Sequence, residues 1–227
     1  MAKFIFDNRL KEIGINGYYT IAKSSSILSD SRKSDIKTEL EKGKRELINH
    51  LGKENYPNDT ILDGYKLLHS RVGVSNRKNV SSPEMLWKRF AKTNSLPSIN
   101  LLVDYYNLIS LKHSIAIGIH DLKNVRLPIS LTLTTGNEKF VPIGNNNEPK
   151  DVRPEIYSYI DSDNEILCYL ETKQVEKSKV DSSSQEIFII VQGNPNVNQN
   201  LLEKCNDELI SGLETLFSYS ILEQFTL

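Results

Sequence analysis

Hydrophobic residues recur at helical spacing in several stretches of the chain. In the first stretch, Ile36, Leu40, Leu47, Ile48 and Leu51 fall on one face. Gaps of three and four positions of this kind predict an amphipathic helix with one buried side. The same pattern predicts helices over residues 34–51, 58–72, about 82–92, 98 to about 112, and about 200–219.

Short runs of aromatic and β-branched residues occupy much of the rest of the chain and are typical of strands. The residues Asp161, Ser162, Asp163 and Asn164 separate two such runs with the chemistry of a hairpin turn. Loops are expected over the serine-rich residues 23–32 and over residues 144–149. The predicted strands cover residues 4–6, 17–22, 115–119, 129–134, 139–143, 157–160, 166–170 and 187–191.

The sequence Ser81-Ser82-Pro83-Glu84 is a strong signal for the start of a helix. Ser82 is expected to cap the helix, and Pro83 suits its first position. Glu84 favours the positive end of the helix dipole.

The order of these elements, helices first, then a run of strands and then a final helix, indicates an α+β fold. We expect helices packed on a largely antiparallel or mixed sheet. No linker, repeat or low-complexity tract divides the chain, and the apolar faces of the first helices need a sheet to cover them. One domain over residues 1–227 is therefore expected.

The charge balance limits how the protein can bind nucleic acid. The chain has 28 basic and 29 acidic residues, a net charge of -1. Nucleic-acid binding relies on positive charge facing phosphates, so it would have to come from a local, salt-sensitive patch. Two cysteines among 227 residues do not form a disulfide framework and favour a reducing compartment. The apolar run Phe4–Phe6 is too short for a signal peptide, no run reaches the ~20 residues of a membrane span, and a cytoplasmic location is expected.

Generic chemical motifs identify no activity. The four histidines, His50, His69, His113 and His120, belong to no close cluster with cysteines of the kind zinc needs, so no metal is expected. The sequence contains no glycine-rich phosphate loop and no dinucleotide fingerprint, so no cofactor is expected. Cys168 lies in a strand-like run and is expected in the core.

Asp104 and Asn107 lie three positions apart on a predicted helix, so their side chains are expected close together. A structural hydrogen-bonded pair is favoured over a direct role in chemistry.

A cluster of Lys88, Arg89 and Lys92, with Trp87 and Phe90 between them, has the composition of an RNA-binding surface. The basic side chains would bind phosphates and the rings would stack on bases. An ordinary amphipathic helix has the same composition, and this alternative stays open.

Five segments, in conserved order and spacing, resemble a known family: the B3/4 domain of the bacterial phenylalanyl-tRNA synthetase beta subunit. Residues 96–107 resemble its N-P-L-V-D-x-x-N segment, with Leu101 in place of the proline. The resemblance covers about residues 81–193 and is closer still to stand-alone members, which share the Ser81-Ser82-Pro83-Glu84 helix start. The other four segments are residues 117–125, 136–140, 157–161 and 179–187.

The resemblance implies tRNA or aminoacyl-tRNA as the partner. In the synthetase, this domain hydrolyses tyrosine wrongly attached to phenylalanine tRNA, and a glutamate recognises the phenol. By register Glu176 falls on that glutamate, Gly118 falls on a histidine of the family pocket, and His120 lies two positions further on the same strand face. These three residues are the expected substrate-binding residues, with Asp104 and Asn107 as structure near the pocket.

Two functions follow as alternatives. The first is a free-standing hydrolase of misacylated tRNA, which would not ligate amino acids by itself. The second is a non-catalytic module that binds a free amino acid or another small molecule. Neither function involves DNA or a membrane.

Overall fold

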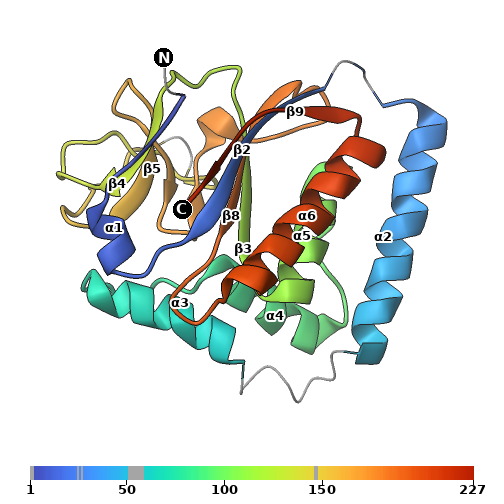
Figure 1. Cartoon of the computed structure of the whole chain (residues 1–227), viewed down its shortest axis with the longest axis horizontal. Coiled ribbons are helices and arrows are strands. Elements are labelled where there is room, and N and C mark those ends of the chain that lie inside the picture. Colours follow the sequence, from blue (N-terminus) through green and yellow to red (C-terminus); the bar gives the residue numbers. More distant parts are fainter. Residues whose placement is uncertain (1–2, 25, 27, 51–58, 146–147) are drawn as a thin grey trace.

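A computed structural model describes residues 3–24, 26, 28–50, 59–145 and 148–227, and it places two β-sheets beside a group of helices (Figure 1). The helices in chain order are α1 (Arg9–Glu12), α2 (Asp30–His50), α3 (Thr60–Arg71), α4 (Ser82–Thr93), α5 (Leu101–His113) and α6 (Gln199–Thr215), with a short 3-10 helix η2 (Glu176–Ser178). The strands are β1 (Phe4–Phe6), β2 (Gly17–Ser24), β3 (Ala116–Asp121), β4 (Ile129–Leu133), β5 (Tyr157–Ile160), β6 (Ile166–Tyr169), β7 (Lys173–Gln174), β8 (Glu186–Gln192) and β9 (Tyr219–Thr226).

The four-stranded sheet separates two hydrophobic cores. Its order is β3-β8-β2-β9, and all its pairings are antiparallel. Because side chains alternate along a strand, Ile187 and Ile189 of β8 face the helices, while Phe188 and Ile190 face the second sheet. In Figure 1 the helices α5 and α6 lie on one side of this sheet, and β4 and β5 lie on the other.

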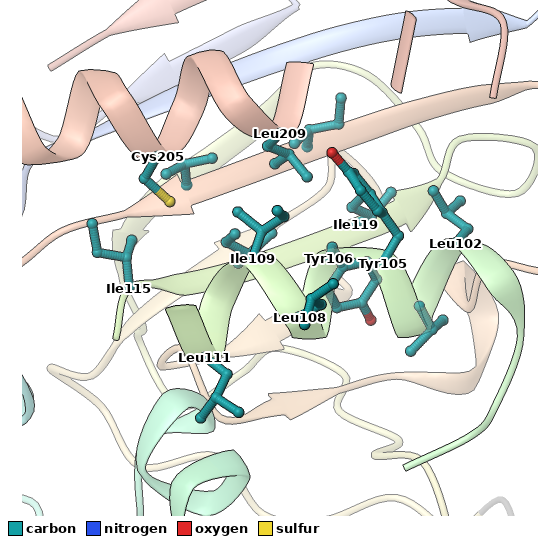
Figure 2. Close-up of a cluster of buried hydrophobic side chains, with 14 of the residues drawn as sticks. Leu102, Tyr105, Tyr106, Leu108, Ile109, Leu111, Ile115, Ile119, Cys205 and Leu209 are labelled. Atoms are coloured by element: carbon teal, nitrogen blue, oxygen red, sulfur yellow. The ribbon is translucent and has the colours of Figure 1, made fainter. Parts of the chain in front are cut away.

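The core on the helical side is built mainly from α5 and α6. Ile109 of α5 approaches Cys205 and Leu209 of α6 in Figure 2, and all three are buried. Burying such an apolar side chain stabilises the fold by roughly 1.5–3 kcal/mol. Helix α2 packs on the outer side of α5.

The second core lies between the two sheets and is rich in aromatic rings. The five-stranded sheet has the order β1-β4-β5-β6-β7, with β1 parallel to β4 and its other pairings antiparallel. Phe4 of β1 stacks on Tyr19 of β2 at 4.5 Å between ring centroids. Tyr159 of β5 approaches the same Tyr19 ring at 6.0 Å, so rings from both sheets hold the layers together.

The α+β class is confirmed, with two sheets where a single one was expected. The predicted helices all occur, as does the β5–β6 hairpin, in which Asp161 Oδ1 accepts the backbone N–H groups of Asp163 and Glu165. The predicted end of the first helix at residue 51 and the start of the second at residue 58 lie outside the described residues.

Three local predictions are wrong. Residues 139–143 form two isolated bridges instead of a strand, and one of them is made by Pro142, which has no N–H to extend a ladder. Helix α5 begins at Leu101 because Asn100 caps it by accepting the Val103 N–H. Ser81, one position before the expected residue, occupies the N-cap of α4.

The C-terminal segment also differs from its prediction, because a turn replaces the last residues of the expected helix and leads into a strand that was not predicted. Helix α6 ends at Thr215, and Ser218, with a φ of 58°, turns the chain into β9. Alternate residues of β9 are exposed, as in a strand with one face toward water.

Candidate functional site

A cavity of about 580 Å³ lies at the β3 edge of the four-stranded sheet. The β6–β7 hairpin of the second sheet and the helices α4 and α5 supply its other walls. Met85, Ile99, Val103 and Ile190 give it apolar sides. Its size is within the range of pockets that hold small ligands.

Gly118 and His120 lie on the face of β3 that points toward the second sheet. Gly118 lines the cavity, and a Cβ at this position would lie 3.2 Å from Gln174 Nε2 and 3.9 Å from His120 Nε2. The absence of a side chain therefore keeps open the space between the Gln174 amide and the His120 ring.

His120 is fully buried beside this space. Its Nδ1 is 2.8 Å from the Ser178 hydroxyl, while its Nε2 has no hydrogen-bond partner among the described residues. Burial lowers the pKa of His120 to about 4, so the imidazole is neutral at physiological pH.

Gln192, at the end of β8, presents a second buried polar atom. Its Oε1 accepts a 2.6 Å hydrogen bond from the Tyr159 hydroxyl. Its Nε2 is buried and finds no partner in the described part of the chain, although the residue lines the cavity. A buried donor without a partner typically costs about 1–3 kcal/mol, which a ligand oxygen would offset.

Glu171 brings a buried carboxylate to the cavity wall. Its Oε1 is 2.7 Å from His69 Nε2, and its Oε2 accepts a hydrogen bond from the Tyr157 hydroxyl. The side chains of Glu171 and His69 are 3% and 1% exposed, so the pair is shielded from water.

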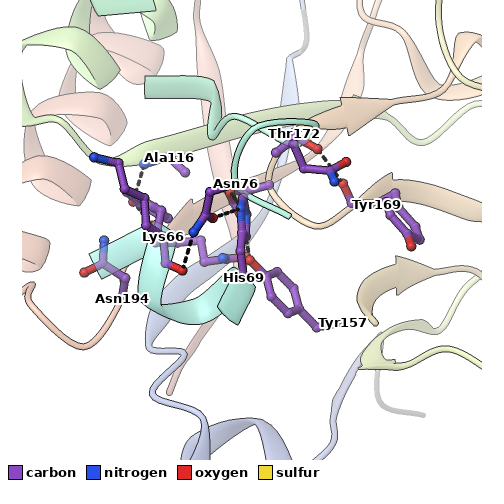
Figure 3. Close-up of polar contacts among 12 residues, drawn as sticks. Lys66, His69, Asn76, Ala116, Tyr157, Tyr169, Thr172 and Asn194 are labelled. Carbon is purple, nitrogen blue, oxygen red and sulfur yellow. Dashed lines mark hydrogen bonds and ion pairs between the residues drawn. The ribbon is translucent and has the colours of Figure 1, made fainter. Parts of the chain in front are cut away.

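The hydrogen bonds around His69 fix its protonation state (Figure 3). Asn76 Nδ2 donates to the Lys66 carbonyl, which turns Asn76 Oδ1 toward His69 Nδ1 at 3.1 Å. Both ring nitrogens of His69 therefore face acceptors, and only the imidazolium can donate to both. Burial by itself lowers the pKa of His69. The hydrogen bond and negative charge of Glu171 and the hydrogen bond with Asn76 act in the opposite direction and are stronger, so the pKa is raised.

Glu176, the expected recognition residue, lies outside this cavity. It is the first residue of η2 and borders a separate surface hollow with Lys177 and Val175. Its carboxylate is 49% exposed and pairs with Lys179 at 3.0 Å. Glu171, five positions earlier, is the acidic residue among the described ones that the fold brings to the cavity wall.

Asp104 and Asn107 have separate surroundings. Asp104 is buried and accepts the Ile99 N–H at 2.8 Å and the Ser98 hydroxyl at 3.2 Å, which ties down the chain before α5. Asn107 lines the cavity and is half-buried. The structure thus gives Asp104 a structural contact and places Asn107 where a ligand would meet it.

The basic cluster on α4 keeps its charges at the surface but not its rings. Lys88, Arg89 and Lys92 are exposed, and Lys88 pairs with Glu84 at 2.8 Å. Trp87 and Phe90 are 2% and 3% exposed. Their burial in the core excludes base stacking on these two rings and agrees with the alternative of an ordinary amphipathic helix.

A second groove, of about 550 Å³, lies between α2 and the helices α5 and α6. Its Glu208 carboxylate is bonded to Lys112 at 2.6 Å and to His113 at 2.8 Å. Because these polar groups satisfy one another, the cavity at β3, with its unpartnered Gln192 and adjacent His120 atoms, is the better candidate for a site.

Sequence reasoning missed several residues that make up the cavity, including Glu171, Gln192, Lys150 and Lys173. The only available signal was Gln192, a polar residue that ends an apolar strand. His69, the hydrogen-bond partner of Glu171, belongs to no cluster of histidines and cysteines in the sequence and therefore gave no signal.

Comparisons with known proteins place the chain among characterised folds. A family model described as the B3/4 domain matches residues 66–214, more than half of the chain. No curated protein matches the chain. The structure is similar to an N-terminal fragment of the phenylalanyl-tRNA synthetase beta-subunit from Pyrococcus horikoshii, with a TM-score of 0.52 and 15% sequence identity. The match covers 96% of this chain and 50% of that one, so the chain spans about half the length of its structural relative. Among the described residues, no helix is long and apolar enough to cross a membrane.

Proposed function

Because the chain belongs to the B3/4 domain family, we propose that it acts on aminoacyl-tRNA: the cavity at β3 binds the amino acid and its ester, and the protein hydrolyses that ester in misacylated tRNA. The structural likeness supports this proposal, since the relative is a fragment of a tRNA synthetase subunit. The chain matches half of that fragment, and ligation of amino acids to tRNA is not part of the proposal.

The observation that carries the proposal is the Nε2 of Gln192, which has no partner among the residues that the structure describes and belongs to a cavity with mostly apolar sides. An ester carbonyl has no proton to donate and accepts hydrogen bonds, so it complements a buried amide N–H. The apolar side formed by Met85, Val103 and Ile190 would receive the side chain of the amino acid.

The side-chain amide N–H groups of Gln192 and Gln174 suit the chemistry of ester hydrolysis. Attack by water adds its oxygen to the carbonyl carbon, places negative charge on the carbonyl oxygen and then releases the ribose oxygen with a proton. Donors fixed toward a developing oxyanion lower the barrier to such a step. Gln192 Nε2 is one donor, and Gln174 Nε2, beside Gly118, is the second.

Helix α4 connects the cavity with a surface for the tRNA body. Ser82 and Met85 line the cavity, and Arg89 and Lys92 lie one to two turns further along the same helix and are exposed. Contacts of these side chains with phosphates would weaken in salt, which agrees with a chain whose net charge is -1.

The test is deacylation of tRNAs charged with tyrosine, phenylalanine and a panel of other amino acids. We expect selective loss of one mischarged species, slower by about 10²–10³-fold in Gln192→Met, which removes the donor but keeps an unbranched side chain of similar length. Glu176→Ala is the matched control and should retain the wild-type rate, because its carboxylate lies outside the cavity. Equal rates in the wild type and Gln192→Met would remove the proposed role of Gln192, and uniformly flat traces from folded protein would reject hydrolysis.

One feature favours a second candidate, the binding of a free amino acid without chemistry. Both oxygens of Glu171 are bonded, to His69 and to Tyr157, so this carboxylate is not free to act as a general base. A saturable rise in unfolding temperature with one amino acid, without deacylation, would support this candidate.

A further inference from the structure

Two lysine side chains line the cavity without an acidic partner among the described residues. Lys173, on β7, is half-buried, and Lys150 belongs to the loop that precedes β5. Lys173 Nζ donates to the neutral Asn79 Oδ1 at 3.0 Å and lies 6.0 Å from the centre of the Tyr169 ring. Neither ammonium group takes part in an ion pair formed within the described part of the chain.

The two ammonium groups act on each other. Burial lowers the pKa of Lys173, and the positive charge of Lys150 lowers it further. Like charges that share a cavity wall destabilise one another until an anion lies between them or beside them. The pair therefore has a free-energy reason to bind a negative group.

The acidic residue of the cavity does not supply that group. Glu171 lines the same cavity, but its charge is matched by the imidazolium of His69 at 2.7 Å. Among the lining residues of the cavity, Lys150 and Lys173 carry +2 and Glu171 carries -1, so the walls have a net charge of +1 on a chain whose overall charge is -1.

We propose that Lys150 and Lys173 form an oxyanion-binding subsite of the cavity, which holds either the phosphate that precedes the aminoacylated nucleotide or the carboxylate of a free amino acid. If the subsite holds the phosphate, it rests on the proposed function. If it holds the carboxylate, it rests on the alternative function, the binding of a free amino acid. In either form it requires that the ligand carry a negative group in addition to the amino-acid side chain.

The experiment measures binding by calorimetry with stable analogues. The first pair of probes is an adenosine with the amino acid attached to its 3′ position through an amide, prepared with and without a 5′-phosphate. The second pair is the free amino acid and its carboxamide. Orthophosphate alone is the fifth probe, because it reports on the subsite independently of the aminoacyl group.

Three variants accompany the wild type. Lys150→Met and Lys173→Met remove the charge and keep an unbranched apolar side chain. Lys42→Met is the matched control, because Lys42 pairs with Glu39 on the exposed side of α2, away from the cavity. Unfolding temperatures establish that each variant is folded, and relief of repulsion is expected to leave Lys173→Met at least as stable as the wild type.

If the subsite takes phosphate, the 5′-phosphate raises affinity about tenfold or more in the wild type and in Lys42→Met. This gain disappears in Lys150→Met and Lys173→Met and shrinks with added salt. If it takes a carboxylate, the free amino acid binds more tightly than its carboxamide, with the same dependence on the two lysines, and the action on aminoacyl-tRNA then loses its support.

The remaining outcomes separate the two proposals. Equal affinity for the analogues with and without phosphate, and for the amino acid and its carboxamide, would overturn the oxyanion subsite and leave the aminoacyl cavity intact. Lysine-dependent binding of orthophosphate without binding of any aminoacyl probe would keep the subsite and reject the proposed function. No binding of any probe would reject both.

Discussion

Replacing His69 with leucine removes the positive charge that faces the Glu171 carboxylate. The two side chains are 1% and 3% exposed, and His69 Nε2 lies 2.7 Å from Glu171 Oε1. Breaking a buried pair by removing one partner typically costs about 3–5 kcal/mol. We expect His69→Leu to lower the free energy of unfolding by about this amount, a large part of the ~5–15 kcal/mol of a typical domain.

A double-mutant cycle isolates the interaction from the loss of each side chain. Glu171→Gln removes the charge and keeps an oxygen that can accept the Tyr157 hydroxyl. The double variant His69→Leu/Glu171→Gln buries neither charge. Its cost is therefore expected to fall below the sum of the single costs by up to about 3 kcal/mol.

The pH dependence of the pair follows from the pKa of His69, which is raised above the ordinary histidine value of about 6.5. In the native protein His69 holds its proton to a higher pH than in the unfolded chain. The stabilisation is therefore fully present below about pH 6.5 and is lost as pH rises through the native pKa. The double variant carries neither titrating group, so the difference in unfolding free energy between wild type and double variant should shrink as pH rises above about 6.5 and through the native pKa of His69.

Urea unfolding followed by tryptophan fluorescence is a suitable assay. Trp87 is the single tryptophan of the chain and is 2% exposed in the native state. Single-variant costs that simply add in the double variant, to within about 0.5 kcal/mol, would show that His69 and Glu171 do not form a charged pair. A wild-type advantage that is constant over the same pH range would show that His69 is not an imidazolium.

Three further predictions concern two close contacts and one partly buried ion pair. Gly118→Ala should weaken binding of the aminoacyl probe in calorimetry with little change in unfolding temperature, because its Cβ would enter the cavity 3.2 Å from a side-chain amide nitrogen. Gly212→Ala should cost about 1–3 kcal/mol in urea unfolding, because a Cβ there would lie 1.8 Å from Tyr105 Oη, and adding Tyr105→Phe should recover part of the loss. The third prediction concerns Glu208, whose pKa is lowered from 4.5 to about 2 by its hydrogen bond with His113. This pair therefore stabilises the protein above about pH 4.5 and is lost as pH falls through about 2. Glu208→Gln should consequently be less stable than the wild type at neutral pH and equal to it in strong acid.

Elements with local signals could be predicted from the sequence. The apolar spacing located α2 and α5, and the run from Asp161 to Asn164 located the β5–β6 turn. Gly118, expected from the family register to bind the substrate, lines the cavity, and its role there stays a prediction. Strand β9 could not be predicted in this way, because it is defined by its pairing with β2 at the other end of the chain.

The polar pairs of the cavity could not be predicted, because their members are distant in sequence. His69 and Glu171 are 102 positions apart and meet only after the second sheet has packed beside α3. The register that selected Glu176 crossed the β6–β7 turn, where Leu170 has a φ of 57°. Glu171 lies within this turn and is buried, whereas Glu176 lies beyond β7 on η2 with its carboxylate half-exposed.

The same distance in sequence explains why composition could not reveal the charge of the site. A net charge of -1 argued against broad nucleic-acid binding, and the structure still gathers Lys150 and Lys173 at one cavity. Their charges remain available to a ligand because the imidazolium of His69 is paired with Glu171. His69 thus links the stability of the fold to the electrostatics of the cavity, because loss of its proton would leave the negative charge of Glu171 to oppose the two lysines. The histidine that the sequence presented as isolated therefore affects how strongly the cavity attracts an anion.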